Sequence, residues 1–303
     1  MADRAAAAQV LQDTATRWGQ QRRLEFIDFR LYWEGRINRA DLTEHFGISV
    51  PQASLDLARY QQIAPINLIY ERREKVYLAT PEFKPVLAPG HSDAYLDQLL
   101  AVASGTLAKD TVFIGWAPPT DLVRAPHRRV PSDTLIAVLR AIRQLLVLEV
   151  MYQSFNQPAP TKRLISPHAI AFDGFRWHVR AYCHTRKEFR DFVLGRLLEI
   201  QPQSKSDIDP QSDHAWNTFL EVKIAPHPKL TESQRRAVEL DYGMTGGVAV
   251  LPTRQALLFY VLKHLELSRD APNMAAAQQI VLANEDKLAP YLHASVAVPF
   301  PNK

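Results

Sequence analysis

The sequence of 303 residues contains a single cysteine, Cys183. One cysteine excludes an internal disulfide and is typical of proteins from a reducing compartment. Long apolar runs are also missing, because Arg, Glu or Pro interrupts each of them well before the roughly 20 residues that a membrane span requires. The first ten residues include Asp3 and Arg4 and lack the apolar stretch of a signal peptide. We therefore expect a cytoplasmic protein with no membrane partner.

Motifs that carry enzyme chemistry are missing as well. There is no Gly-x-Ser-x-Gly nucleophile elbow, and Gly246-Gly247 is an isolated pair, not a phosphate-binding loop. No His-x-x-x-His, Cys-x-x-Cys or carboxylate cluster offers a metal site. We expect no catalytic residues, no metal and no cofactor, and therefore a protein that is not an enzyme.

The charge is unevenly distributed along the chain. The formal net charge of +4 permits a polyanionic partner without requiring one. Residues 1–80 contain eleven Lys and Arg against ten Asp and Glu, whereas residues 161–196 contain eight against three. A chain of this length with 47% hydrophobic residues is expected to form two or three domains. The basic excess lies in the middle of the chain.

Helices dominate the first 65 residues. Apolar residues at helical spacing predict helices over residues 5–18 and 24–33, and Gly35 ends the second. Two further helices are expected between residues 38 and 65, separated by a glycine turn at Gly47. Asn38 and Ser49 are the expected N-caps of these two helices.

Residues 40–54 resemble the helix-turn-helix of bacterial repressors. Ala40 allows close helix packing, Gly47 permits the turn, and Ile48 holds the two helices together. The second helix then presents short polar side chains from the end that enters a major groove. The predicted groove-facing residues are Ser49, Gln52 and Ser54. Gln52 can pair with adenine through two hydrogen bonds, and Arg59 is placed to reach a phosphate.

The pattern changes to strands after Pro65. Residues 67–70 and 75–78 are predicted strands around a polar tip, as in a β-hairpin. A hairpin behind a recognition helix is typical of a winged helix, and contacts with the DNA backbone are predicted for Arg72, Arg73 and Lys75. The alternative is a small helical domain with a hairpin and no role in DNA binding.

Residues 81–131 contain seven prolines and predict a connector with one helix over residues 94–104. The helix predicted next, over residues 132–144, has an apolar face made of Leu135, Ile136, Leu139 and Ile142. Strands are then predicted over residues 146–152, 161–165, 169–172, 175–182 and 189–194. Several short strands at close spacing favour a small antiparallel barrel.

The strand over residues 175–182 alternates clearly between two faces. The face predicted to fill the barrel consists of Phe175, Trp177, Val179 and Ala181. The opposite face consists of Arg176, His178, Arg180 and Tyr182. Two arginines and a histidine in a row require water or an anion beside them.

Residues 152–196 resemble a WYL domain. The resemblance rests on Tyr152-Gln153-Ser154, on Lys162 to His168, on Gly174 to Cys183, and on Arg186, Phe189 to Phe192 and Arg196. The Trp-Tyr-Leu triplet that names the family is Trp177-His178-Val179 here. The resemblance implies an Sm-like small β-barrel that senses a nucleic acid or a nucleotide. It also implies a ligand pocket lined by Tyr152, Ser154, Arg163, His168, Arg180, Arg190 and Arg196.

The residue types themselves agree with an anionic ligand. Arginine binds phosphate through two parallel hydrogen bonds, and tyrosine and histidine rings offer stacking surfaces for bases. The alternative is that these arginines form a solvated rim in which they pair with Asp173, Glu188 and Asp191.

The last hundred residues predict a small α/β module. Residues 201–213 form a polar linker, strands are expected over residues 220–224 and 246–251, and helices over residues 231–242 and 254–265. The module resembles the C-terminal extension through which WYL-domain regulators dimerise.

We therefore predict an α+β, multidomain protein. Its expected parts are a winged helix-turn-helix domain (residues 1–80), a connector (81–131), a WYL ligand-sensing domain (132–205) and a C-terminal dimerisation module (206–303). This order resembles repressors of bacterial anti-phage operons. It implies a nucleoid-associated homodimer that binds double-stranded operator DNA at an inverted repeat and releases it when an anionic effector, a nucleic acid or nucleotide, binds. The alternative is an accessory protein that binds single-stranded nucleic acid and modulates a partner defence enzyme.

Overall fold

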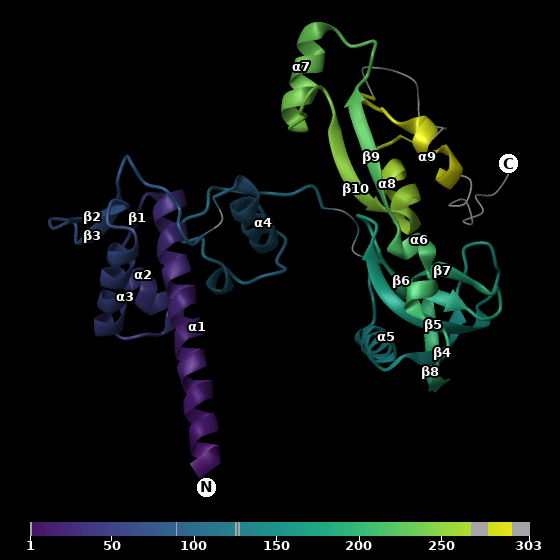
Figure 1. The fold of residues 1–303 in the computed structure, drawn as a ribbon, viewed down its shortest axis with the longest axis horizontal. Coiled ribbons are helices and arrows are strands. Elements are labelled where there is room, and N and C mark those ends of the chain that lie inside the picture. Colours follow the sequence, from purple (N-terminus) through teal and green to yellow (C-terminus); the bar gives the residue numbers. More distant parts are fainter. Residues whose placement is uncertain (1, 89, 125, 127, 268–277, 293–303) are drawn as a thin grey trace. The chain divides into compact units, whose positions relative to one another are not determined.

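The computed structural model describes the backbone of residues 2–88, 90–124, 126, 128–267 and 278–292, and the side chains within these ranges from residue 18 onward. Two units separate along the chain, residues 1–124 and residues 125–303 (Figure 1). No helix in the described ranges is both long enough and apolar enough to span a bilayer. The α+β, multidomain architecture predicted from the sequence is confirmed.

The first unit begins with one continuous helix, α1 (Ala2–Glu34), where we predicted two. Residues 19–23 join the two predicted segments and contain one glycine, Gly19, followed by glutamines and arginines. A glycine inside a helix costs about 1 kcal/mol relative to alanine, and Gln and Arg are good helix formers. The helix therefore continues through the expected break.

The predicted helix-turn-helix is confirmed, and its two helices are α2 (Arg39–Phe46) and α3 (Val50–Ile63). Asn38 caps α2, since its side chain accepts the N–H of Asp41 at 3.0 Å. Gly47 ends α2 with a left-handed backbone, at a φ of 63°. Ser49 caps α3 by accepting the N–H of Gln52 at 3.4 Å. These caps fix the turn and therefore the direction in which α3 leaves it.

A small antiparallel sheet of order β1-β3-β2 packs with these helices. Its strands are β1 (Arg36–Ile37), β2 (Leu68–Glu71) and β3 (Val76–Ala79). The predicted hairpin is confirmed, whereas β1 is too short to show an alternating pattern in the sequence. The core shared by helices and sheet includes Phe26, Ile27, Leu31, Ile37, Leu42, Leu57, Tyr60 and Leu68.

Residues 81–124, predicted to be part of a connector, pack on α1. The carboxylate of Asp28 is fully buried and accepts the backbone N–H groups of residues 86–88 at 2.7 to 2.9 Å. Glu34 accepts the N–H of Gly115 at 2.7 Å. The segment contains α4 (Ser92–Ala103) and a 3-10 turn (Lys109–Thr111). Two acidic side chains of α1 therefore hold this proline-rich segment on the winged helix.

The second unit contains a five-stranded antiparallel sheet of order β7-β6-β5-β4-β8. Helix α5 (Ser132–Gln144) precedes the strands, which are β4 (Leu146–Tyr152), β5 (Thr161–Phe172), β6 (Trp177–Cys183), β7 (Glu188–Val193) and β8 (Leu197–Lys205). A 3-10 turn (Leu194–Arg196) joins β7 to β8. The sheet and α5 enclose one core around Val150, Ile165 and Val179.

Two strand predictions were wrong. β5 is one strand where we predicted two, because a register shift between Pro167 and Ala169 lets the pairing continue past the proline. β8 occupies part of the segment predicted as a polar linker, and it pairs with β4. Most of its side chains are polar and exposed, so its sequence lacks the alternation that identifies a strand.

The predicted buried face of α5 was wrong at three of its four residues, since only Ile142 packs against the core. Leu135, Ile136 and Leu139 are exposed. The buried residues are instead Thr134, Val138 and Ala141. These side chains are smaller, and they let the helix lie close to β5 and β8.

The exposure of side chains on the two faces of β6 differs from the prediction. Val179 and Ala181 fill the core as expected, but Phe175 and Trp177 are about half exposed, at 55% and 48%. They lie at or before the first residue of β6, beyond the edge of the core. The opposite face was expected to meet water or an anion, yet His178 and Arg180 are buried.

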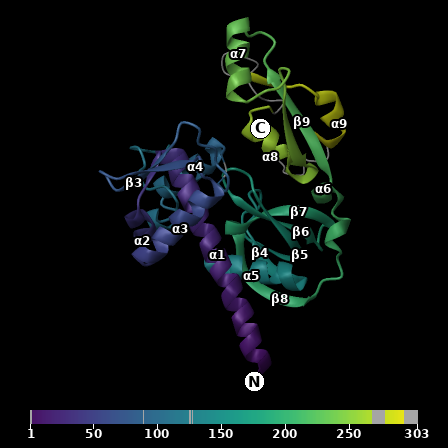
Figure 2. The ribbon, with the colours of Figure 1, turned by 60° about the vertical axis from the view of Figure 1, so that its left-hand side comes forward.

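The C-terminal module covers that face. It contains α6 (His214–Asn217), β9 (Phe219–Pro226), α7 (Glu232–Asp241), β10 (Ala249–Arg254), α8 (Leu258–His264), β11 (Ile280–Leu282) and α9 (Glu285–Leu292). Two 3-10 turns, Pro210–Ser212 and Gln255–Leu257, precede α6 and α8. The sheet order is β10-β9-β11, and α6 and α8 lie at the end of the module next to β6 and β7 (Figures 1 and 2).

The predicted strand over residues 220–224 and the helix capped by Thr231 are confirmed. β10 begins three residues later than predicted, because Gly246 and Gly247 adopt positive φ in a turn. The last predicted helix is shorter than expected, since its first residues form a 3-10 turn. β11 and α9 were not predicted.

Candidate DNA interface and ligand pocket

The three residues predicted to read a DNA groove all lie in the first turns of α3. Ser49 is exposed and uses its hydroxyl to cap the helix. Gln52 is half-buried, and its side-chain N–H donates to Asp56 Oδ1 at 3.1 Å. The Ser54 hydroxyl donates to the carbonyl of Val50 at 3.0 Å. Each of the three residues therefore uses a polar group in a hydrogen bond within the protein.

Asp56 anchors α3 to α1. Its side chain is fully buried and accepts Nε of Arg23 at 2.6 Å. A buried carboxylate without a partner is strongly unfavourable, so this pair fixes the position of the recognition helix. Gln52 donates a further hydrogen bond to the Asp56 carboxylate.

Arg39, at the start of α2, links the recognition helix to the hairpin. Its Nε donates to Ser54 Oγ at 2.8 Å, and its Nη2 donates to the hydroxyl of Tyr77 at 3.4 Å. The guanidinium also lies 5.6 Å from the ring centre of Tyr70, within cation–π range. Arg39 was not predicted from the sequence, because its contacts join three elements that are distant along the chain.

The predicted phosphate contacts are exposed. Arg72, Arg73 and Lys75 lie in the turn between β2 and β3. The Glu71 carboxylate organises this turn by accepting the backbone N–H groups of Arg73 and Glu74. Arg59 is exposed on α3 and donates to Gln62 at 3.1 Å. Four cations are thus available on α3 and the hairpin.

The second unit contains a cavity of about 760 Å³ between the WYL-like sheet and the C-terminal module. Five of the seven residues predicted to bind an effector line it, namely Tyr152, Ser154, Arg163, Arg190 and Arg196. The volume lies within the 300 to 1,000 Å³ that is usual for small-molecule sites.

Further basic residues line the same cavity. Those that sequence analysis did not assign to the pocket are Arg128, Arg176, Arg186, Lys263 and His264. Arg176 and Arg186 belong to the segment that resembles a WYL domain, so a broader assignment would have included them. Lys263 and His264 come from α8 of the C-terminal module, and nothing in the sequence indicated that α8 reaches this cavity.

Acidic residues neutralise part of this charge. Asp173 lies 3.5 Å from Arg176 Nε, and Arg190 pairs with Glu188 at 2.8 Å. Arg180 also lies 3.2 Å from Asp191, so all three acids named in the alternative pair with arginines. Within the described ranges, Arg163, Arg186 and Arg196 form no ion pair. These three arginines leave the cavity with a positive excess.

Aromatic rings provide flat surfaces in the cavity. Tyr152 packs edge-on against Phe192, with ring centres 5.0 Å apart, and its hydroxyl accepts the N–H of Val193 at 3.3 Å. Phe155 is 77% exposed, and the Arg196 guanidinium lies 6.0 Å from its ring centre. Arginine beside exposed aromatic rings is the combination that binds phosphate and stacks bases.

The other two predicted effector residues, His168 and Arg180, are engaged in a buried network around Asp213. Arg180 donates to both carboxylate oxygens of Asp213, through Nε at 2.7 Å and Nη2 at 3.0 Å. His168 Nε2 lies 3.0 Å from the same carboxylate. Asp213 also caps α6 by accepting the N–H of Trp216 at 3.1 Å.

Burial raises the pKa of the Asp213 carboxyl, but the hydrogen bonds from His168 and Arg180 outweigh it and hold the pKa well below its usual range. Arg180 in turn stays charged, because Asp213 and Asp191 raise the pKa of its guanidinium against the effect of burial. This network therefore joins β5 and β6 to the start of the C-terminal module. His168 and Arg180 serve structure in this arrangement.

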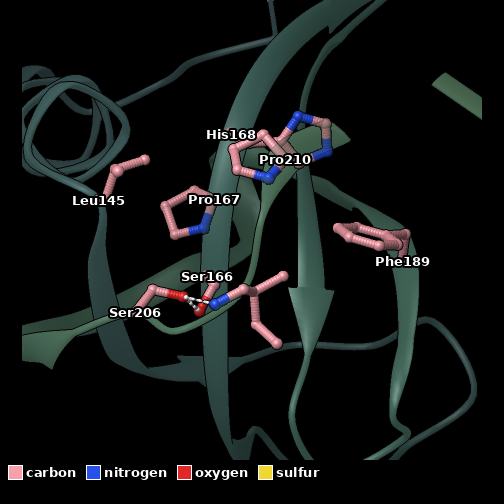
Figure 3. A pocket seen from close by; sticks show the side chains of 8 residues that line it. Leu145, Ser166, Pro167, His168, Phe189, Ser206 and Pro210 are labelled. Carbon is pink, nitrogen blue, oxygen red and sulfur yellow. Dashed lines mark hydrogen bonds between the residues drawn. The ribbon is translucent and has the colours of Figure 1, made fainter. Parts of the chain in front are cut away.

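His168 lines a second, much smaller cavity with Ser166, Phe189 and Ser206 (Figure 3). Its volume of about 10 Å³ is roughly that of one water molecule. The Ser206 hydroxyl donates to Ser166 Oγ at 2.7 Å across it, which holds the end of β8 against β5. A nucleotide does not fit beside His168.

Asp191 connects the large cavity to the buried network around Asp213. Asp191 lines the cavity, accepts Arg180 Nη1 at 3.2 Å and accepts the hydroxyl of Tyr260 in α8 at 3.1 Å. Burial, and then the neighbouring Asp191, raise the pKa of Tyr260 far above its usual value, so the phenol remains a hydrogen-bond donor. Asp191, in β7, therefore links β6 to α8. No group of His, Cys, Asp and Glu in the described residues has the geometry of a metal site.

Three parts of the chain match domains of known regulators. Residues 19–101 match the BrxR transcriptional regulator winged helix-turn-helix domain, residues 133–202 the WYL domain, and residues 219–288 the BrxR C-terminal dimerization domain. A similarity to the proteasome accessory factor B/C of Arthrobacter aurescens has a TM-score of 0.25 at 16% identity and covers 86% of this chain and 45% of that chain.

Curated relatives match almost the whole chain. The DNA-binding transcriptional repressor CapW of Stenotrophomonas maltophilia is 47% identical and covers 91% of this chain and 93% of its own length. The proteins of the same name from Pseudomonas aeruginosa and Escherichia coli (strain KTE188) are 46% and 44% identical, each over 90% of this chain and 91% of their own length. The chain therefore belongs to the CapW family of DNA-binding transcriptional repressors, with a BrxR-type winged helix, a WYL domain and a C-terminal dimerization domain.

Proposed function

We propose that this protein represses a phage-defence operon and that an anionic effector, a nucleic acid or a nucleotide, releases it from its operator. The observation that carries this proposal is the basic and aromatic cavity between the WYL domain and α8 of the dimerization domain. A ligand in that cavity touches the domain that holds two protomers together.

On the DNA side, α3 of each protomer enters a major groove of an inverted repeat. In such dimers the two grooves are roughly 34 Å apart, or a multiple of that distance. Ser49, Gln52 and Ser54 face the bases, and Gln52 exchanges its bond with Asp56 for one with adenine. The phosphate contacts are made by Arg59, Arg72, Arg73 and Lys75.

On the effector side, Arg163, Arg190 and Arg196 bind phosphate groups, while Tyr152 and Ser154 contact the remainder of the ligand. The volume of about 760 Å³ suits a dinucleotide or a short oligonucleotide better than a single small anion. We leave His168 and Arg180 out of this contact set because both are bound to Asp213.

Release follows from the position of Asp191. A phosphate near this carboxylate repels it and favours a state in which Asp191 no longer accepts the Tyr260 hydroxyl. The dimerization domain then changes its position on the WYL sheet. To shift operator occupancy from nearly full to nearly empty, the effector must bind the released state about 5.5 kcal/mol more tightly.

A gel-shift titration tests the DNA side of the proposal. The purified chain is titrated into the duplex from upstream of its own gene, a scrambled duplex and a single strand of equal length at about 150 mM salt. Selective binding of the upstream duplex supports the repressor. Equal or tighter binding of the single strand contradicts it and favours an accessory protein that holds single strands for a defence enzyme.

A further inference from the structure

The face of α3 that points away from the core is apolar over its first two turns. Ala53, Leu57 and Tyr60 are buried against α1, so the opposite side of a helix with 3.6 residues per turn carries Pro51, Leu55 and Ala58. All three are exposed, and none has a side-chain donor or acceptor. Leu55 is the largest of them, with 64% of its surface accessible.

The polar residues beside this face are already bonded. Gln52 donates to Asp56, and Ser54 accepts Nε of Arg39 at 2.8 Å while donating to the Val50 carbonyl. The Ser54 hydroxyl already gives its single donor to Val50, and one side-chain N–H of Gln52 is held by Asp56, so donation to a base through these groups requires that an internal bond be exchanged. Apolar contact through Leu55 requires no such exchange.

The chemistry of the major groove identifies what this leucine contacts. The C5-methyl group of thymine is the one apolar group that a base pair presents there. From the position and exposure of Leu55 we infer that it is a specificity-determining residue that packs on a thymine methyl in each half of the operator. This inference rests on the proposed binding of duplex DNA through α3.

The expected effect is set by the removal of one methyl group. Burial of one methyl or methylene is worth about 0.8 kcal/mol, which corresponds to about a fourfold change in Kd. Replacing the contacted thymine by deoxyuridine removes only this methyl and leaves the pairing edge unchanged. Substitution in both halves of the inverted repeat should weaken binding by roughly fifteenfold, since the effects of two separate sites multiply.

The test is a deoxyuridine scan of the bound duplex. The operator is first located by footprinting on the upstream duplex, and each thymine is then replaced symmetrically by deoxyuridine. Fluorescence anisotropy gives Kd for wild type and Leu55→Ala on every duplex. We expect one thymine position at which wild type loses affinity and Leu55→Ala binds thymine and deoxyuridine duplexes equally well.

Arg59→Ala is the matched control on the same helix. It should weaken binding to the thymine and deoxyuridine duplexes by the same factor and lower the slope of log K against log salt by about two, one for each protomer. Leu55→Ala should leave the slope unchanged. Because Leu55 is exposed, its variant should keep the thermal midpoint of wild type.

Two outcomes overturn the inference and are distinguishable from each other. If wild type binds every deoxyuridine duplex as tightly as the parent duplex, or if Leu55→Ala keeps the discrimination, thymine recognition by Leu55 is wrong while repression stands. A protein partner on this face then becomes the explanation for its apolar character. If no duplex is bound selectively, the proposed repressor function fails together with this inference.

Discussion

Replacement of Asp213 tests whether the buried network joins the WYL and dimerization domains. Asp213→Ala leaves Arg180, only 7% exposed, with Asp191 as its remaining carboxylate and removes the cap of α6. Removing one partner of a buried ion pair costs about 3 to 5 kcal/mol. Because Asp191 stays at 3.2 Å, we expect a loss near the lower end, about 3 kcal/mol.

The assay is urea unfolding of the full chain, followed by tryptophan fluorescence and circular dichroism. The matched control is Glu149→Ala, which breaks the exposed pair with Lys162 and should cost less than about 1 kcal/mol. Hydrogen exchange of the peptide covering residues 210–218 locates the effect. A loss below 1 kcal/mol for Asp213→Ala, with unchanged exchange at α6, would refute the reasoning.

The same carboxylate predicts a pH dependence. Its folded pKa lies below its unfolded value of about 3.9, so its contribution to stability is complete above that value and is lost as the pH falls further. Asp213→Asn removes this charge. The difference in unfolding free energy between wild type and Asp213→Asn should therefore be constant from pH 5 to 7 and shrink below pH 4.

Three other predictions concern positioning and coupling. Arg39→Met should raise Kd for the operator about tenfold without changing the salt slope, because Arg39 positions the hairpin. Arg72→Ala should lower that slope by about two, one for each protomer. Identical slopes for both variants would contradict these roles. Asp28→Ala should destabilise the first unit by about 3 kcal/mol in urea unfolding, since three backbone N–H groups lose their acceptor. A loss below 1 kcal/mol would argue against that anchor. Tyr260→Phe should bind the operator more weakly than wild type without effector, as measured by anisotropy, because it lacks the hydrogen bond to Asp191 that holds the unreleased state; an unchanged operator Kd would remove Tyr260 from the coupling.

The winged helix was predictable from sequence because its determinants are local. Asn38, Gly47 and Ser49 each act within four residues along the chain, and the structure places all three as caps. Arg39 illustrates the opposite case. Its partners are Ser54 and Tyr77, which are distant in sequence, and no local pattern indicates that they meet.

The ligand pocket was predictable only in part, for a similar reason. Arg163, Arg190 and Arg196 lie in or beside strands of one sheet, so a resemblance over this segment places them at one cavity. Arg180 looked equivalent on β6, but Asp213 covers it from outside the sheet. Lys263 and His264 reach the cavity from α8, whose packing on the sheet depends on tertiary contacts such as that between Tyr260 and Asp191.

The prediction of which α5 residues are buried was wrong for another physical reason. The periodicity of large apolar residues selected Leu135 and Leu139, whereas close packing on the sheet selected the smaller Val138 and Ala141. Hydrophobic size and buried position are different quantities, and only the second depends on how near the helix lies to its sheet.

The measurement that tests the central claim most directly is effector-driven release of the operator. A preformed complex of the full chain with its fluorescent operator duplex is titrated with short single-stranded oligonucleotides and dinucleotides, and anisotropy is followed for wild type and for Arg163→Ala with Arg196→Ala. The account predicts release from wild type, and an unchanged duplex Kd with little release for the double variant. Release that is equal in both proteins, or absent with every nucleic acid and nucleotide tested, would contradict it.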